Sequence, residues 1–222
     1  MSKVLDRLAD ASGILHVLLV FGGYVFLVAP YMPESLDSPD AALAHLEAHP
    51  PSAAFWAGLW LEAAGLLMLV LLAARIASRI RRVDPDGWLP SAAVGIAVAA
   101  VTVKIGSFAP GLAALEIDRF DAATVTALLS INDASVGVAG ALDGAFVLLL
   151  GLGAVALRAL PRWLSWLTVA AGVALLAAPV LDSLQLLFFV WLLTVSAWLL
   201  ARGARTPAAP VGGPLAQSAA RA

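Results

Sequence analysis

Three ionisable side chains, Glu62, Lys104 and Asp143, lie within long apolar segments of the sequence. An ionised side chain among hydrocarbon costs about 2.5–3.5 kcal/mol on membrane-insertion scales, so it has to be paired, neutralised or hydrated. Intramembrane groups of this kind commonly line the path of a proton, an ion or a substrate. These residues are therefore the candidates for chemistry, and the chemistry expected of them is proton or cation coupling or the binding of a small polar solute.

The neighbours of these residues predict that they face other helices rather than lipid. Small residues recur one or two helical turns away: Gly58 and Gly65 near Glu62, Ala97 and Ala100 near Lys104, and Gly140 and Gly144 near Asp143. Such residues let helix backbones approach closely. We therefore expect a buried Glu62–Lys104–Asp143 cluster, with Asn132 and Asp133 at its outer mouth. Two acids against one base require a protonated carboxyl, or water or a cation in the cluster.

A purely structural role is the other interpretation of the same residues. Lys104 could extend to the lipid headgroups by itself, and Glu62 could be protonated and hydrogen-bonded to a neighbouring backbone. A polar cluster can also do no more than fix the register of packed helices. A membrane protein without enzymatic activity and without an assigned function is accordingly the first expectation. A small transporter or channel-like protein that couples protons or cations is the alternative.

A third function class, a metal-dependent protein or an intramembrane enzyme, would depend on His45 and His49. They lie four residues apart, a spacing that places both rings on one face of a helix and can bind a metal ion. No third ligand is evident, so a solvated helix surface is the simpler interpretation and no metal site is predicted. His16 is isolated in sequence and is expected to be a hydrogen-bonded packing residue.

Most enzyme classes lack their motifs in this chain. We find no His-Glu-x-x-His, no phosphate-binding loop, no dinucleotide fingerprint and no Gly-x-Ser-x-Gly with a partner histidine. The chain has no cysteine, which excludes disulfides, thiolate catalysis and Cys-ligated zinc or iron–sulfur clusters. We expect no cofactor and no nucleic-acid partner; membrane lipids are the expected surroundings.

The elements that would position the ionisable residues are membrane-spanning helices. Of the 222 residues, 62% are hydrophobic and 13% are charged, and the mean hydropathy is +0.95. A helix of about 20 apolar residues crosses the hydrocarbon layer of a bilayer. The sequence predicts an all-α, polytopic membrane bundle over residues 1–202, with six transmembrane helices at about 12–30, 54–74, 88–108, 135–157, 163–180 and 184–201.

Short helices are also predicted on the outer side of the bundle. Ser38-Pro39-Asp40 has the residues of a helix start, and a second helix is expected from Asp121, running into the fourth span. Glu62 and Asp143 each lie 22 residues after an Asp-Ala-Ala triplet that opens such a helix. This spacing indicates a parallel internal repeat, although alanine-rich sequences also produce such matches by chance.

The distribution of positive charge predicts the orientation. Of the 13 Lys and Arg residues, eleven fall on one side of the predicted spans, Arg119 falls on the other, and Lys104 lies within a span. Cytoplasmic loops carry the excess of positive residues, so both termini are expected in the cytoplasm and the chain in the plasma (inner) membrane. The run from Arg75 to Arg82 is expected to contact anionic lipid headgroups. Residues 203–222 are expected to form a disordered cytoplasmic tail.

Two segments resemble a known family. Leu160 to Leu167 (LPRWLSWL), preceded by a glycine-rich span that ends Gly151-Leu152-Gly153, resembles a family of bacterial six-span membrane proteins labelled only as a domain of unknown function. Gly58 to Gly65 (GLWLEAAG) is similar to the second span of that family. The resemblance implies a compact six-helix inner-membrane protein without an assigned activity, and it transfers no functional residue to this chain.

Overall fold

The computed structural model describes residues 3–177 and 185–203, which form helices and no strand. The helices, in chain order, are α1 (Lys3–Val20), the π-helical η1 (Phe21–Val28), the 3-10 turn η2 (Ala29–Tyr31), α2 (Pro39–Ala48), α3 (Ala53–Arg81), α4 (Leu89–Gly106), α5 (Phe108–Ala114), the 3-10 turn η3 (Ile117–Arg119), α6 (Ala122–Ala156), α7 (Arg162–Ala177) and α8 (Gln185–Gly203). The all-helical prediction is thereby confirmed for the part of the chain described.

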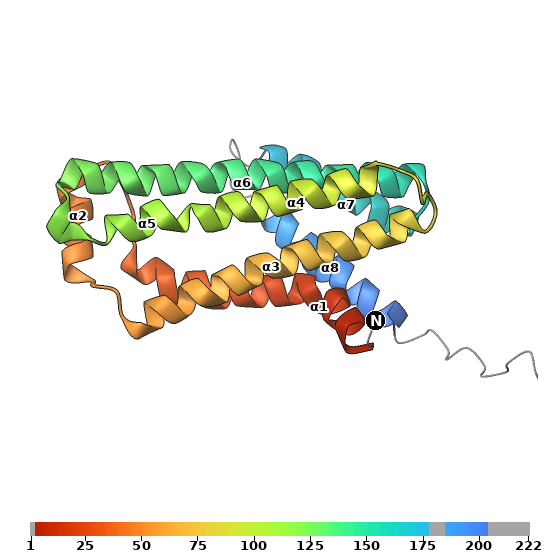
Figure 1. Cartoon of the computed structure of the whole chain (residues 1–222), viewed down its shortest axis with the longest axis horizontal. Coiled ribbons are helices and arrows are strands. Elements are labelled where there is room, and N and C mark those ends of the chain that lie inside the picture. The colour runs from red at the N-terminus through yellow and green to blue at the C-terminus, as the bar shows by residue number, and fades with distance from the viewer. Residues whose placement is uncertain (1–2, 178–184, 204–222) are drawn as a thin grey trace, which may run out of the picture.

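The long helices pack against one another in the order in which they occur in the chain (Figure 1). α1 packs against α3, α3 against α4, α4 against α6, α6 against α7, and α7 against α8, which returns to α1. The result is a closed ring of helices around an apolar core, whose buried members include Leu72 and Ile76 of α3, Phe146 and Leu150 of α6, and Trp191 of α8.

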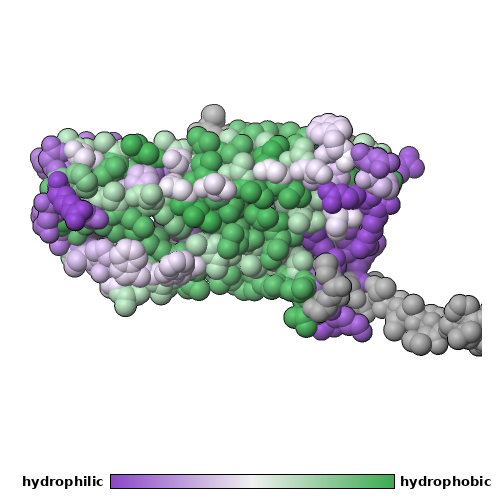
Figure 2. Space-filling model, viewed as in Figure 1, coloured by the Kyte–Doolittle hydropathy of each residue, from purple (hydrophilic) through white to green (hydrophobic). Residues whose placement is uncertain are grey.

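Four helical stretches of the described residues are long and apolar enough to cross a membrane: Lys3–Tyr31, Ala53–Arg81, Leu89–Ala114 and Ala122–Ala156. Two shorter apolar helices, Arg162–Ala177 and Leu186–Arg202, complete the ring. Figure 2 shows an apolar belt between two hydrophilic ends. Large apolar side chains such as Phe26, Trp60 and Leu67 are more than half exposed. Apolar helices with this surface indicate a multi-pass membrane protein.

The two ends of the bundle, at the left and the right of Figure 1, hold different charged residues. One, the α2 end, is formed by residues 32–52 and 115–121 and includes the acidic residues Glu34, Asp37, Asp40, Glu47, Glu116, Asp118 and Asp121. The other, the arginine end, holds the start of α1 and the last turns of α3, α6 and α8, with Arg75, Arg79, Arg81, Arg82, Arg158, Arg162 and Arg202.

Both predicted helix starts at the α2 end are confirmed by their caps. The Ser38 hydroxyl accepts a hydrogen bond from the backbone N–H of Ala41, at 3.4 Å. At the start of α6, Asp121 Oδ1 accepts the backbone N–H of Thr124 at 2.8 Å, and hydrogen bonds from Thr124 lower the pKa of Asp121 below its ordinary value. A carboxylate is favoured there because it meets the positive end of the helix dipole.

Several helix bounds differ from those predicted. α3 continues past residue 74 to Arg81, because Ile76 and Ile80 remain buried and Arg79 between them lies over the Trp198 ring, 5.0 Å from its centre. The span predicted from 135 belongs to a helix that begins at Ala122, so α6 joins the outer helix and the span without a break, as expected. α7 and α8 agree with the spans 163–180 and 184–201 where they can be compared. Residues 178–184, with the predicted turn at Asp182-Ser183, and the predicted tail beyond Gly203 lie outside the described residues.

The π-helical segment η1 was not predicted. It holds Gly23, which meets Gly58 of α3 so closely that a Cβ on Gly23 would lie 2.5 Å from the Gly58 carbonyl oxygen. The crossing of η1 and α3 therefore depends on two residues without side chains. This crossing brings η1 onto the helix face that carries Glu62, one turn beyond Gly58.

Candidate functional site

Glu62 and Lys104 meet between α3 and α4. Glu62 is 3% exposed, and its Oε1 lies 3.7 Å from the Nζ of Lys104, whose side chain is 21% exposed. The ammonium group also lies 6.0 Å from the centre of the Tyr24 ring, which comes from η1. Three elements, η1, α3 and α4, thus converge on one ion pair. The small residues predicted to let them approach are buried: Gly58 and Gly65 on α3, and Ala97 and Ala100 on α4.

Asp143 of α6 lies near this pair without joining it. Lys104 forms its ion pair with Glu62, whereas Asp143 and Asp133 act on it only through the longer-range electrostatic field. Asp143 Oδ1 is buried and has no hydrogen-bond partner among the described residues. The structure thus brings Glu62 and Lys104 into contact, and within the described residues no ion pair joins Asp143 to them.

The helix face around Asp143 also differs from the expected one. Gly144 is buried and packs against Leu175 and Leu176 of α7, as a helix-packing glycine should. Gly140, predicted to share that role, has no atom within 4 Å of the position where its Cβ would be. Of the two glycines, Gly144 therefore contacts another helix, whereas Gly140 contacts none at its Cβ position. The space at Gly140 lies one helical turn from Asp143.

A cavity of about 60 Å³ adjoins the ion pair. Its lining includes Glu62, Lys104, Tyr24 and Asn132. Most of its other lining residues are apolar, so the polar groups form one part of the wall. A cavity of this size has room for a few water molecules or a small cation beside those groups. The ionised groups are therefore next to space that water can fill, which a dry structural ion pair would not need.

A second cavity, of about 310 Å³, lies between this site and the α2 end. Glu34, Asn132 and Asp133 are among its lining residues. Tyr24, Met32 and Asn132 line both cavities, so the two adjoin one another. Asn132 is half-buried and Asp133 is exposed. Asn132 therefore lies where the two cavities adjoin, and Asp133 lines the outer cavity.

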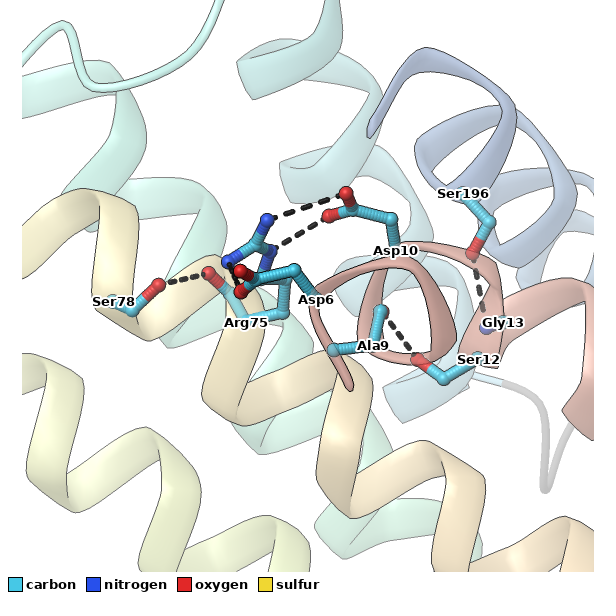
Figure 3. A network of polar contacts seen from close by, with 8 residues as sticks. All are labelled: Asp6, Ala9, Asp10, Ser12, Gly13, Arg75, Ser78 and Ser196. Atoms are coloured by element: carbon cyan, nitrogen blue, oxygen red, sulfur yellow. Dashed lines mark hydrogen bonds and ion pairs between the residues drawn. The ribbon is translucent and has the colours of Figure 1, made fainter. Parts of the chain in front are cut away.

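A second polar network, at the arginine end, was missed in the sequence (Figure 3). Arg75 of α3 donates from Nε to Asp10 Oδ1 at 2.6 Å, from Nη2 to Asp10 Oδ2 at 3.2 Å, and from Nη1 to Asp6 Oδ1 at 3.0 Å. Asp10 is only 2% exposed. Arg75 therefore binds two carboxylates of α1, and its prediction as a lipid-contacting residue is wrong. The available signal was the spacing of Asp6 and Asp10, which places both on one helix face.

α8 is tied to the same region of α1. The Ser196 hydroxyl accepts the backbone N–H of Gly13 at 2.9 Å (Figure 3). A Cβ on Gly13 would lie 2.7 Å from the Leu192 carbonyl oxygen, so the two helices approach closely at this glycine. This network therefore joins α1, α3 and α8 at the end of the bundle opposite the cavities. Its contacts explain how these three helices are held together, which is a structural role.

The histidines take positions that a structural role explains. His16 Nδ1 lies 2.8 Å from the carbonyl oxygen of Gly65, which agrees with the predicted packing role. His45 and His49 stack with ring centres 4.3 Å apart, and His49 Nδ1 is 2.9 Å from the His45 carbonyl oxygen. Over residues 3–177 and 185–203, no group of three or more His, Cys, Asp or Glu side chains is arranged to hold a metal ion. The pair thus gains no third ligand from the described fold.

The helical ring and its buried ion pair define a multi-pass membrane protein with an ionisable site between its helices. The model of the family described as Domain of unknown function (DUF4386) matches residues 12–203, and the chain belongs to that family. The resemblance of Leu160 to Leu167 and of Gly58 to Gly65 to a family labelled as a domain of unknown function is thereby confirmed. No curated protein and no solved structure matched the chain.

Proposed function

We propose that this protein is a small transporter or channel-like protein that binds a proton or a small cation at the Glu62–Lys104 site, reached from the α2 end, and passes it across the membrane. The observation that carries the proposal is the pair of adjoining cavities, which connects the α2 end with the buried ion pair. The setting is a bacterial plasma (inner) membrane protein with six transmembrane helices. Both termini are cytoplasmic and the α2 end is outside, in accord with the excess of arginine at the opposite end.

The charges along this route favour cations. Glu34 and Asp133 line the outer cavity, and Glu62 lies at its inner end, with Asp143 nearby. Among residues 3–177 and 185–203, Lys104 is the one basic side chain that lines either cavity. A cleft lined by one sign of charge raises the local concentration of the opposite ion. Three carboxyl groups against one ammonium group line the two cavities, so the route draws protons and cations in and repels anions.

In this proposal the ammonium group of Lys104 occupies the place next to Glu62 that the transported proton or cation would take. Its Nζ lies 3.7 Å from Glu62 Oε1, which is longer than a charge-assisted hydrogen bond of about 2.7–2.9 Å. The ion pair is therefore loose enough to be broken by a competing proton or cation. When a proton or a cation reaches Glu62, the ammonium group is displaced and needs another acceptor. The buried Oδ1 of Asp143, which has no hydrogen-bond partner in the described structure, is the acceptor at hand. The exchange of Lys104 between Glu62 and Asp143 is the coupling step of the proposal.

The size of the inner cavity limits the cargo. About 60 Å³ accommodates water, a proton carried on water, or a monatomic cation, and it excludes metabolites of several heavy atoms. The proposal therefore concerns protons and small cations and not the broader class of polar solutes.

Ion flux in reconstituted liposomes tests the proposal. Purified protein is placed in proteoliposomes that contain a pH-sensitive dye, and flux is started by a gradient of protons or of a monovalent cation. Wild-type protein is expected to dissipate a gradient that empty liposomes retain, and Glu62→Gln is expected to slow this flux by about tenfold or more, since Gln keeps the shape and removes the charge.

The matched control is Glu47→Gln, the same substitution at an exposed position of α2. It is expected to conduct as the wild type does, and melting temperatures of both variants show that they are folded. Wild-type liposomes that hold every gradient as well as empty ones would refute the proposal. Equal flux through wild type and Glu62→Gln would refute the assigned site.

A further inference from the structure

At the arginine end, a cavity of about 540 Å³ lies at the junction of α6 and α7. Its lining combines two arginines, Arg158 and Arg162, with Ser165 and with the apolar side chains of Val155, Leu160 and Trp166. It is unconnected with the cavities at the α2 end, since it shares no lining residue with them. The cavity thus offers positive charge on one side and apolar surface on the other.

The two arginines are free to bind a ligand. Both side chains are exposed, and within the described residues neither forms an ion pair or a side-chain hydrogen bond. Arg75 of the same end contrasts with them, since both edges of its guanidinium group are used by Asp6 and Asp10. Two unpaired guanidinium groups that line one cavity are a binding site for an anion, and phosphate oxygens suit their planar donor geometry.

The backbone at Arg158 is unusual for a residue with a side chain. Its φ is 53°, in the left-handed region, and it follows Leu157, the C-cap of α6. The Ala159 N–H bonds to the Ala154 carbonyl oxygen at 3.2 Å, which is the bond of a Schellman turn. Glycine is the usual residue at this position because it takes such a φ without steric conflict. With arginine at this position, a guanidinium group lines the cavity, and the backbone takes a conformation that is strained for a residue with a side chain.

The aromatic residues place the cavity at the level of lipid headgroups. Trp163 and Trp166 of α7 are 55% and 53% exposed, and exposed tryptophans collect at the membrane–water interface. Trp166 lines the cavity itself. An occupant at this depth has its charged part in the interface and its apolar part among the acyl chains.

We propose that this cavity binds the headgroup of an anionic phospholipid, with the phosphate held by Arg158 and Arg162 and the first part of an acyl chain lying along Trp166 and Val155. Because both arginines are positively charged, the cavity should bind an anionic lipid more tightly than a zwitterionic lipid of the same chain length. The inference rests on the proposed membrane location alone and not on ion flux through Glu62.

Lipid binding to the purified protein tests the inference. Native mass spectrometry of detergent-solubilised protein counts bound lipid during titration with phosphatidylglycerol, with phosphatidylcholine or with inorganic phosphate. Wild type is expected to retain phosphatidylglycerol specifically. An arginine near a charged lipid surface contributes about fivefold in affinity, so Arg158→Gly combined with Arg162→Gln is expected to weaken binding about 30-fold.

The choice of Arg158→Gly guards against misfolding, because glycine is the residue that the turn favours. The control is Arg81→Gln, which removes an exposed arginine from the same end of the bundle; Arg81 donates to the Ser91 hydroxyl at 3.1 Å. It is expected to bind phosphatidylglycerol as the wild type does. Equal affinity of the double variant and the wild type, equal retention of phosphatidylcholine, or equally strong binding of inorganic phosphate would overturn the inference. Ion flux, measured separately, leaves each of these outcomes unchanged.

Discussion

Arg75 satisfies the conditions under which a charge can lie at the edge of an apolar bundle. Its side chain is 16% exposed, and its partner Asp10 is more deeply buried. The guanidinium group meets both oxygens of Asp10 and one of Asp6, a bidentate arrangement that offsets the loss of hydration. Nothing in the composition marks this arginine out from Arg79, Arg81 and Arg82, which follow it on the same helix.

Removal of this guanidinium group should destabilise the protein strongly. Arg75→Leu leaves Asp10 buried without its partner, and breaking such a pair costs about 3–5 kcal/mol of unfolding free energy. Arg82→Leu, at an exposed position of the same end, should change it by less than about 0.5 kcal/mol. Chemical denaturation in detergent micelles measures both. Since an apolar pair can replace a buried ion pair, Asp10→Leu with Arg75→Leu should recover most of the loss, and a stable Arg75→Leu single variant would contradict this account.

The residue scale also marks where sequence reasoning reaches its limit for the site. The cost of burying a charge made Glu62, Lys104 and Asp143 conspicuous, and the small residues near each of them indicated that they face other helices and could meet. Whether Lys104 pairs with Glu62 or with Asp143 depends on the rotation of α4 about its own axis, and a sequence does not specify that angle. The Asp10–Arg75 pair stayed hidden for another reason: both residues lie at span ends, where charges are common and do not demand a partner.

At the scale of elements, the contact between α6 and α7 depends on close backbone approach. A Cβ on Gly151 would lie 2.7 Å from the backbone nitrogen of Val169, and a Cβ on Gly172 would lie 2.5 Å from that of Leu148. Each helix thus presents a glycine to the backbone of the other. In lipid, where apolar side chains gain little by leaving the solvent, such backbone contact is a main source of helix association.

A pair of alanine substitutions within α6 separates packing from helix propensity. Gly151→Ala should destabilise the protein by about 1–3 kcal/mol, because its methyl group overpacks the contact with α7. Gly137→Ala, at a position with no atom within 4 Å, should be neutral or stabilising by up to about 1 kcal/mol, as expected for alanine in a helix. Thermal unfolding of the two variants provides the comparison. A destabilisation of equal size in both would show that helix packing at Gly151 is not the cause.

The elements themselves were largely predictable, and the errors have physical causes. Caps at Ser38 and Asp121 located two helix starts, because the side chain that accepts the first N–H groups is visible in the sequence. The end of α3 was misplaced because mean hydropathy falls as soon as arginines appear, even though Ile76 and Ile80 continue the buried face. The π-helical form of η1 has no residue code that distinguishes it from an α-helix.

At the scale of the whole molecule, the ring of helices follows the chain order, because each long helix packs against the next long helix along the chain. Neighbours in sequence become neighbours in space, and α8 closes the ring against α1. The asymmetry of charge between the α2 end and the arginine end then predicts how the ring sits in a membrane. Both properties are global, so they survive errors of several residues at individual helix ends.

The absence of cysteine makes this orientation directly measurable. Single cysteines at Asp37, exposed at the α2 end, and at Asp86, exposed in the turn between α3 and α4, are the only thiols of their variants. A membrane-impermeant maleimide should label Asp37→Cys on intact cells, and Asp86→Cys only after the membrane is opened. Labelling of Asp86→Cys alone on intact cells would reverse the orientation. Labelling of both would contradict a full crossing by α3.

The wide turns of η1 have a consequence for how the first span tolerates insertions and deletions. A π-helical turn differs from an α-helical one by the single residue it adds to each hydrogen-bonded loop. Loss of one residue at Gly22, whose surroundings are open, would let the segment tighten into ordinary α-helix while everything before it keeps its direction. The same tightening with no residue lost would turn everything before it by about 100°. Asp10 would then face away from Arg75, and His16 away from the Gly65 carbonyl. The first helix is thus fitted to α3 by a residue count as well as by residue types.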